Sequence, residues 1–176
     1  MKRLAILVAV FVSLSLVASN AQSPVPNINP LVGQWKPNLD KSTYFPGPRP
    51  APGGGGRNYI DRGNGLIAEV RLNVGATGAP ALGNVWSGKF DGTATPVYGQ
   101  GALLTFLEAG TKSMATRSYR VVDASTLEAT NRNGMVVANT ATLAVAKDGK
   151  TMTETVKNFN MQGQQVGMNV IVYDRQ

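Results

Sequence analysis

Residues 113–159 read SMATRSYRVVDASTLEATNRNGMVVANTATLAVAKDGKTMTETVKNF. Turn-forming residues divide this stretch into β-like runs at 113–122, 126–132, 135–146 and 151–159. The dividing turns include Asn133-Gly134 and Asp148-Gly149, and an Asx-Gly pair flanked by such runs is a strong signal for a β-hairpin. The stretch therefore predicts a succession of antiparallel strands joined by tight turns.

The same pattern continues on both sides of this stretch. Similar runs lie at 57–62, 66–74, 84–90, 103–108 and 166–174. No segment shows the periodicity of an amphipathic helix, and strands joined by short connections must be antiparallel neighbours. A long meander either stacks as a sandwich or closes, and closure removes exposed sheet edges. We predict a single all-β domain, an antiparallel up-and-down β-barrel of about 8–10 strands, in preference to the sandwich.

One run shows the alternation of a half-buried strand particularly well. Between residues 66 and 74, one face of the strand carries Leu66, Ala68, Val70, Leu72 and Val74. The opposite face carries Glu69, Arg71 and Asn73. We expect the apolar face to point into the domain, with Glu69 and Arg71 forming an exposed ion pair on the other face.

The N-terminus has the layout of a secretory signal. Lys2 and Arg3 precede an apolar run at 4–17, and the small residues Ser19 and Ala21 follow it. The run is shorter than the ~20 residues that a membrane span needs. We therefore expect a signal peptide at 1–21, a flexible leader at 22–30, the barrel domain at 31–176, and a periplasmic or secreted protein without a membrane span.

Composition excludes several kinds of site. The chain has no histidine and no cysteine, so it offers neither the usual zinc ligands nor the base of a Ser-His-Asp triad. We expect no cofactor, no metal and no enzymatic activity. The net charge is +7, falling to about +5 without Lys2 and Arg3, and the remaining basic residues are scattered. Such a pattern indicates solubility and a weak attraction to anionic surfaces rather than nucleic-acid binding. We also expect a monomer.

Residues 29–42, NPLVGQWKPNLDKS, contain Gly33-Gln34-Trp35 at the start of the first run, and DGKTMT follows at 148–153. This arrangement resembles a family of exported bacterial lipocalin-like proteins. The resemblance implies that Trp35 closes the base of the barrel while Gly33 lets the chain bend beneath it. Lipocalins also carry a helix after the barrel, a Thr-Asp-Tyr type turn and an Arg over the Trp. The helix and the turn are missing here, and Arg175, the one candidate for the Arg, is left unassigned.

The resemblance implies a ligand site inside the barrel. Trp86 and Phe90 share a strand face and either line such a site or belong to an ordinary core. Arg117 and Tyr119 are spaced like the inward Arg-x-Tyr that holds the ligand carboxylate in fatty-acid-binding barrels. No carboxylate on the strand of Arg117 is placed to pair with it, so we predict that the ligand's own acidic group does so. The alternative orientation turns this face outward and puts Met114, Thr116 and Ser118 inside.

Two functions remain compatible with these residues. The first is a non-catalytic exported barrel that binds a small hydrophobic or amphipathic, fatty-acid-like ligand. The alternative is an envelope structural or interaction protein whose barrel is filled with side chains. An internal void of at least about 300 Å³ favours the first.

Overall fold

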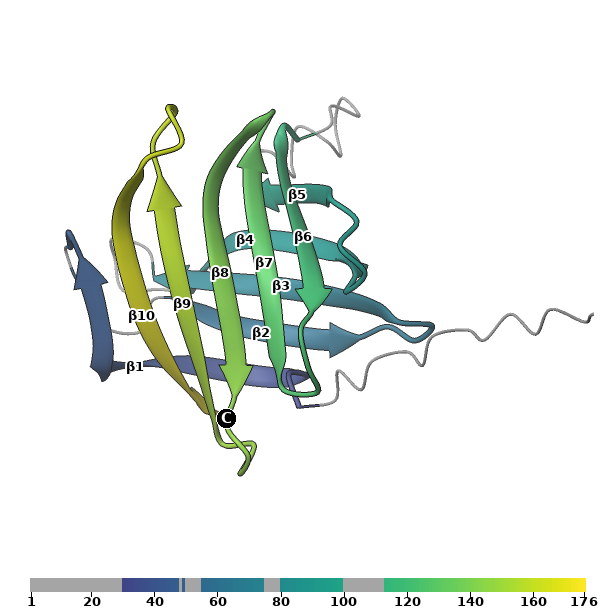
Figure 1. Ribbon diagram of the computed structural model, residues 1–176. Helices are drawn as coiled ribbons and strands as arrows, with labels where there is room; N and C mark the ends of the chain where they lie inside the picture. The colour runs from purple at the N-terminus through teal and green to yellow at the C-terminus, as the bar shows by residue number, and fades with distance from the viewer. Residues whose placement is uncertain (1–29, 48, 50–54, 75–79, 100–112) are drawn as a thin grey trace, which may run out of the picture.

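The structure is a computed structural model that describes residues 30–47, 49, 55–74, 80–99 and 113–176. Within these ranges every regular element is a β-strand (Figure 1). The strands are β1 (Gly33–Phe45), β2 (Gly56–Asp61), β3 (Leu66–Val74), β4 (Pro80–Lys89), β5 (Thr95–Gly99), β6 (Ala115–Val121), β7 (Thr126–Asn133), β8 (Val136–Val145), β9 (Thr151–Phe159) and β10 (Gln165–Arg175).

The strands close into a barrel in the order β1-β10-β9-β8-β7-β6-β5-β4-β3-β2, and every paired neighbour is antiparallel. β1 closes the sheet, because Trp35 lies opposite Arg175 of β10 on one side and opposite Arg57 of β2 on the other. The predicted antiparallel up-and-down barrel is thus confirmed. The strand predicted at 103–108 lies outside the described residues, and β5 was not predicted.

Trp35 and Arg175 fill one end of the barrel, which we call the plugged end. Trp35 is 1% exposed, and its indole Nε1 donates a hydrogen bond to the Leu31 carbonyl at 2.8 Å. The Arg175 guanidinium lies 4.2 Å from the centroid of the Trp35 ring and donates to the Val32 carbonyl at 2.7 Å. Arg175 therefore occupies the position over the Trp that the sequence left unassigned.

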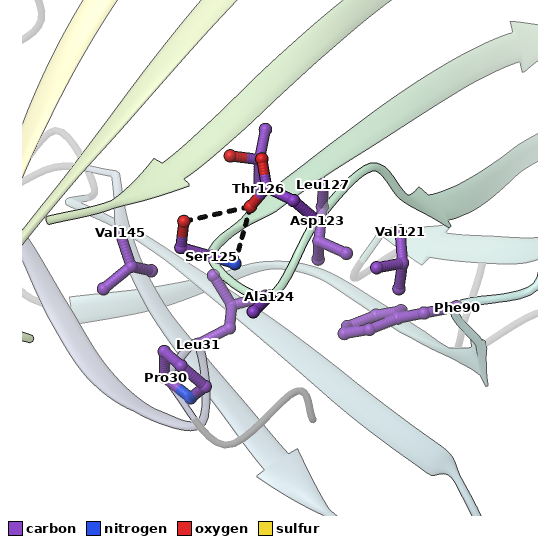
Figure 2. Close-up of a pocket in the computed structure, with 10 residues that line it drawn as sticks. All are labelled: Pro30, Leu31, Phe90, Val121, Asp123, Ala124, Ser125, Thr126, Leu127 and Val145. Carbon is purple, nitrogen blue, oxygen red and sulfur yellow. Dashed lines mark hydrogen bonds between the residues drawn. The ribbon is translucent and has the colours of Figure 1, made fainter. Parts of the chain in front are cut away.

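Gly33 is required by this arrangement. Its φ of +131° is in a region that residues with a side chain rarely adopt, and a Cβ at this position would lie 2.7 Å from Arg175 Nη1. A crevice of about 20 Å³ lies between Leu31, Phe90 and the β6–β7 turn (Figure 2). That volume is about the size of a water molecule, so this crevice does not admit a ligand.

The β3 side chains that face the barrel interior are not the ones predicted from the sequence. Ile67 and Glu69 are fully buried, whereas Leu66 is 39% and Leu72 is 43% exposed. The expected orientation of this strand, with its leucines inside and Glu69 in solvent, is wrong. The physical reason is that the barrel interior contains cationic groups from other strands, and these groups pair with Glu69.

Candidate ligand-binding site

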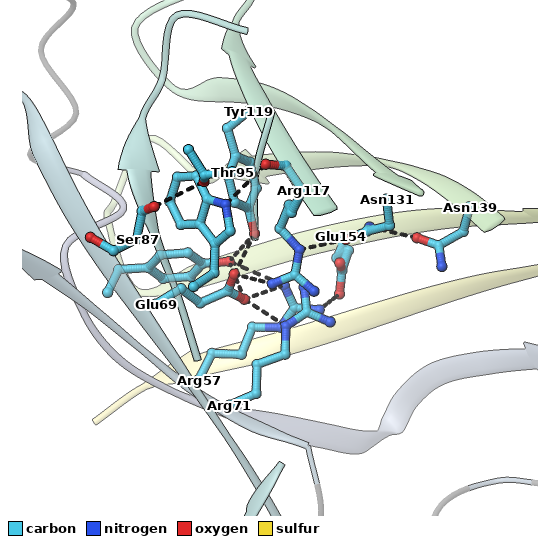
Figure 3. A network of polar contacts seen from close by, with 12 residues as sticks. Arg57, Glu69, Arg71, Ser87, Thr95, Arg117, Tyr119, Asn131, Asn139 and Glu154 are labelled. Carbon is cyan, nitrogen blue, oxygen red and sulfur yellow. Dashed lines mark hydrogen bonds and ion pairs between the residues drawn. The ribbon is translucent and has the colours of Figure 1, made fainter. Parts of the chain in front are cut away.

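A cluster of ionised side chains lies in the middle of the barrel. Arg57 comes from β2, Glu69 from β3, Arg117 from β6 and Glu154 from β9, and all four are at most 6% exposed. Arg71, also from β3, adds a third guanidinium, and its side chain is 22% exposed. Figure 3 shows the three arginine side chains converging near Glu69. We call these five residues the central cluster.

Glu69 is the hub of the central cluster. Its Oε1 lies 2.6 Å from Arg71 Nε and 3.5 Å from Arg57 Nη1, and its Oε2 pairs with Arg117 Nη1. The hydroxyl of Tyr119 donates to Oε2 at 2.8 Å. Both carboxylate oxygens are therefore held by several donors, which is how a buried charge is tolerated.

A second carboxylate completes the cluster on the opposite wall. Glu154 pairs with Arg57 Nη2 and accepts a hydrogen bond from the Tyr173 hydroxyl at 3.1 Å. Arg57 Nε in turn donates to the Tyr173 oxygen at 3.1 Å, and Arg57 Nη1 donates to the Tyr59 oxygen at 3.1 Å. Arg57 thereby links the two carboxylates across the barrel.

The environment fixes the protonation states of these groups. Burial by itself raises the pKa of Glu69, but Arg71, Arg117 and Arg57 outweigh it and hold that pKa well below the ordinary value. Burial, and after it the charge of Glu69, raises the pKa of both Tyr59 and Tyr119. The carboxylate is thus ionised and the phenols remain protonated donors at neutral pH.

The formal charges in the central cluster do not cancel. Within the part of the chain that the structure describes, three guanidinium groups face two carboxylates, so one positive charge is in excess. Arg117 is buried against Glu69 and Asn131, and Arg57 is buried between Glu69 and Glu154. Arg71 is the most exposed of the three arginines, and its Nε donates to Glu69 Oε1. The excess charge is therefore most accessible at Arg71.

Beyond the cluster, on the side away from Trp35, half-buried asparagines face the interior. Asn131 accepts from Arg117 Nε and donates to Asn139 Oδ1 at 2.6 Å. Asn139 pairs with Asn158 across β8 and β9, and Asn84 lies opposite Arg71 across β4 and β3. Asn84 Oδ1 is buried, and among the described residues no group donates to it. This part of the barrel is polar, with amide groups next to a cation.

The residues predicted to line the site all point inward. Arg117 is 4% exposed and Tyr119 is fully buried, whereas Met114 is 73% exposed, so the alternative orientation of β6 does not hold. The Tyr119 ring centroid lies 4.9 Å from that of Trp86 and 5.2 Å from that of Phe90. The indole of Trp86 donates to the Arg117 carbonyl at 2.9 Å. The structure brings these four residues together as one packed group.

The prediction about the counter-ion of Arg117 is wrong. The partner is Glu69 from β3, not a group supplied by a ligand. The two residues are 48 positions apart, and Glu69 was assigned to the outer face of its strand. Once that face assignment is reversed, the need for an external partner at Arg117 disappears.

Sequence reasoning missed most of the central cluster: Arg57, Glu69, Arg71 and Glu154, with Tyr59 and Tyr173 beside them. A signal was present in the spacing. Arg57 and Tyr59, like Arg117 and Tyr119, are two residues apart on their strands and share a face. Two Arg-x-Tyr pairs on different strands indicate a common polar interior more strongly than one pair does.

Comparison with known proteins supports the fold. The crystal structure of the wild-type fluorescent protein UnaG is similar to this chain. The TM-score is 0.51 at 10% sequence identity, covering 85% of this chain and 99% of UnaG. A single-residue mutant of UnaG gives a TM-score of 0.49 at 11% identity, covering 82% and 94%. No protein-family model and no curated protein matches the chain. At this identity the likeness to UnaG extends to the barrel fold.

In the ranges that the structure describes, no helix has the length and apolar character needed to cross a membrane. The same ranges contain no group of three or more acidic side chains placed to hold a metal ion.

Proposed function

We propose that this barrel is a non-catalytic binding module for a small amphipathic molecule that carries an acidic group. The observation behind the proposal is the excess positive charge of the central cluster, together with the partial exposure of Arg71. A cation in a low-dielectric interior is costly unless an anion lies close to it. A carboxylate or similar group of a ligand supplies that anion, and a guanidinium can bind it in bidentate geometry.

The lining beyond the cluster narrows the ligand class. Asn84, Asn131 and Asn139 offer amide groups, while Val156 and Ile171 are partly buried apolar side chains packed against the core. A purely hydrophobic molecule would leave Asn84 Oδ1 without a donor and would bring no anion to the excess positive charge near Arg71, which is unfavourable. An amphipathic anion satisfies both kinds of lining. We assign the acidic group to Arg71 rather than to Arg117, because both pair with Glu69 but the side chain of Arg71 is 22% exposed and that of Arg117 only 5%.

Export, membership of the bacterial lipocalin-like family, a monomeric state and the lack of catalysis are parts of the same proposal. The basic start and apolar run at 2–17 support export. Gly33-Gln34-Trp35 supports the family, and the absence of histidine and cysteine from the chain supports a binding role.

A titration with a matched pair of ligands tests the binding proposal. Lauric acid and lauryl alcohol differ in the acidic group, and Trp86 beside Arg117 provides a fluorescent reporter. We expect the acid to bind more tightly by about 1.5–3 kcal/mol, the contribution of a charge-assisted hydrogen bond. Arg71→Met should remove this preference because it keeps an unbranched apolar side chain and removes the charge.

Arg120→Met is the matched control. Arg120 is on the outer wall, 68% exposed and paired with Glu128, so its loss should leave the preference unchanged. Equal binding of acid and alcohol to the unmutated protein would show that Arg71 does not contact the ligand.

A second candidate function is an interaction protein whose barrel is filled. The observation that favours it is that Arg117, Trp86, Phe90 and Tyr119 satisfy and pack one another without any ligand. If neither the acid nor the alcohol binds, this candidate replaces the first.

A further inference from the structure

Exposed apolar side chains are concentrated at the end of the barrel opposite Trp35, which we call the distal end. Up-and-down connectivity places the β7–β8 and β9–β10 turns there, together with the end of β1 and the start of β6 (Figure 1). Leu66 and Val122 are exposed toward the plugged end. The other exposed large apolar residues of the described chain are toward the distal end: Phe45, Leu72, Met114, Met135, Val136, Met161, Val166 and Met168.

Three methionines are the most exposed of this group and occupy separate segments. Met135 is 95% exposed in the β7–β8 turn, Met161 is 82% exposed in the β9–β10 turn, and Met114 is 73% exposed just before β6. A groove of about 520 Å³ runs between the two hairpin turns, and Phe159 contributes to its lining. Soluble monomers rarely leave so much apolar surface together without a partner.

Among the described residues, the charges near the distal end are basic. Arg132 of β7 and Lys157 of β9 are exposed near the two hairpin turns, and neither has an ion pair among the described residues. The described acidic residues are elsewhere. Four are in or next to turns of the plugged end: Asp61, Asp91, Asp123 and Asp148. Glu69 and Glu154 are buried in the barrel. Asp40, Glu128 and Asp174 form ion pairs on the outer wall.

We infer that this rim, formed by Met114, Met135, Met161, Arg132 and Lys157, docks on an anionic lipid surface. Methionines on separate turns can each enter the boundary between head groups and acyl chains, because unbranched side chains adapt to a fluid environment. Basic residues beside them then meet anionic head groups. The rim charge complements such a surface, whereas two copies meeting rim to rim would bring Arg132 and Lys157 of each close together. This inference does not depend on the ligand proposal.

Co-sedimentation of the full chain with lipid vesicles tests the inference. Vesicles of phosphatidylcholine mixed with phosphatidylglycerol should retain the protein, and pure phosphatidylcholine vesicles should retain much less. The double variant M135S/M161S should weaken binding at least tenfold because both side chains leave the apolar boundary. R132Q/K157Q should weaken it about fivefold for each charge removed and reduce its sensitivity to salt.

L66S/V122S is the matched control, because it removes two exposed apolar side chains toward the plugged end. It should bind the mixed vesicles as the unmutated protein does, and thermal unfolding confirms that all three variants are folded. Absence of binding to mixed vesicles, or an equal loss in the control, overturns the inference. So does a dimer in gel filtration that M135S/M161S dissociates, since a second copy would then cover the rim.

Discussion

Glu69 is the residue on which the barrel interior depends most. It is fully buried and contacts Arg57, Arg71 and Arg117, so its removal leaves three guanidinium groups facing Glu154 alone. We expect Glu69→Gln to lower the free energy of unfolding by about 3–5 kcal/mol, as the loss of one partner from a buried ion pair does. Urea denaturation of the variant and the unmutated protein measures this difference.

Glu128→Gln is the control for this prediction. Glu128 also accepts from an arginine, Arg120, at 2.6 Å, but both side chains are exposed. Its loss should cost less than about 1 kcal/mol. If Glu69→Gln is as mild as Glu128→Gln, the central cluster contributes little to stability and its arginines are neutralised in another way.

At the level of the strand, turn chemistry made the fold predictable. Asn133-Gly134 and Asp148-Gly149 mark two hairpins correctly, and both glycines have positive φ in the structure. The order of strands then follows from the short connections. Alternation also identified the residues of β3 that share a face, but it could not say which face is inside, because that depends on what the interior contains.

The candidate site was less predictable for a related reason. Glu69 pairs with a residue 48 positions away, and Arg57 with one 97 positions away. A single sequence does not show which residues lie opposite one another on such distant strands. The Arg-x-Tyr spacing could therefore suggest that Arg117 is buried, but the identity of its partner became visible only when the barrel closed.

A pair of substitutions in β3 tests the orientation of this strand. Ile67 is fully buried and Leu72 is 43% exposed, although simple hydrophobic alternation places Leu72 inside. We expect Ile67→Ala to lower the free energy of unfolding by about 2–5 kcal/mol, because it leaves a cavity in the core. Leu72→Ala should change it by about 0.5 kcal/mol or less. Denaturant unfolding of both variants gives the comparison, and the reverse order would restore the orientation predicted from the sequence.

For the whole molecule, the titrating groups of the central cluster set the pH range of stability. The pKa of Glu69 is lower in the folded protein than its ordinary value of 4.5, so the unfolded chain takes up a proton first as the pH falls. The stability that Glu69 contributes is therefore complete above about pH 5 and declines below it, by at most about 1.4 kcal/mol per pH unit for each proton.

The alkaline limit has the opposite sign. Burial raises the pKa of Tyr59, Tyr119 and Tyr173 above their ordinary value of 10.0, so the unfolded chain loses these protons first as the pH rises. Stability should therefore decline above about pH 10. Between these limits the chain has no histidine to titrate, so the free energy of unfolding should be nearly level from about pH 5 to pH 9. Urea denaturation at a series of pH values, from below about pH 5 to above about pH 10, measures how the free energy of unfolding depends on pH. Glu69→Gln should flatten the acidic side of this profile, and an acidic side that stays equally steep in that variant would assign the acid transition to other carboxylates.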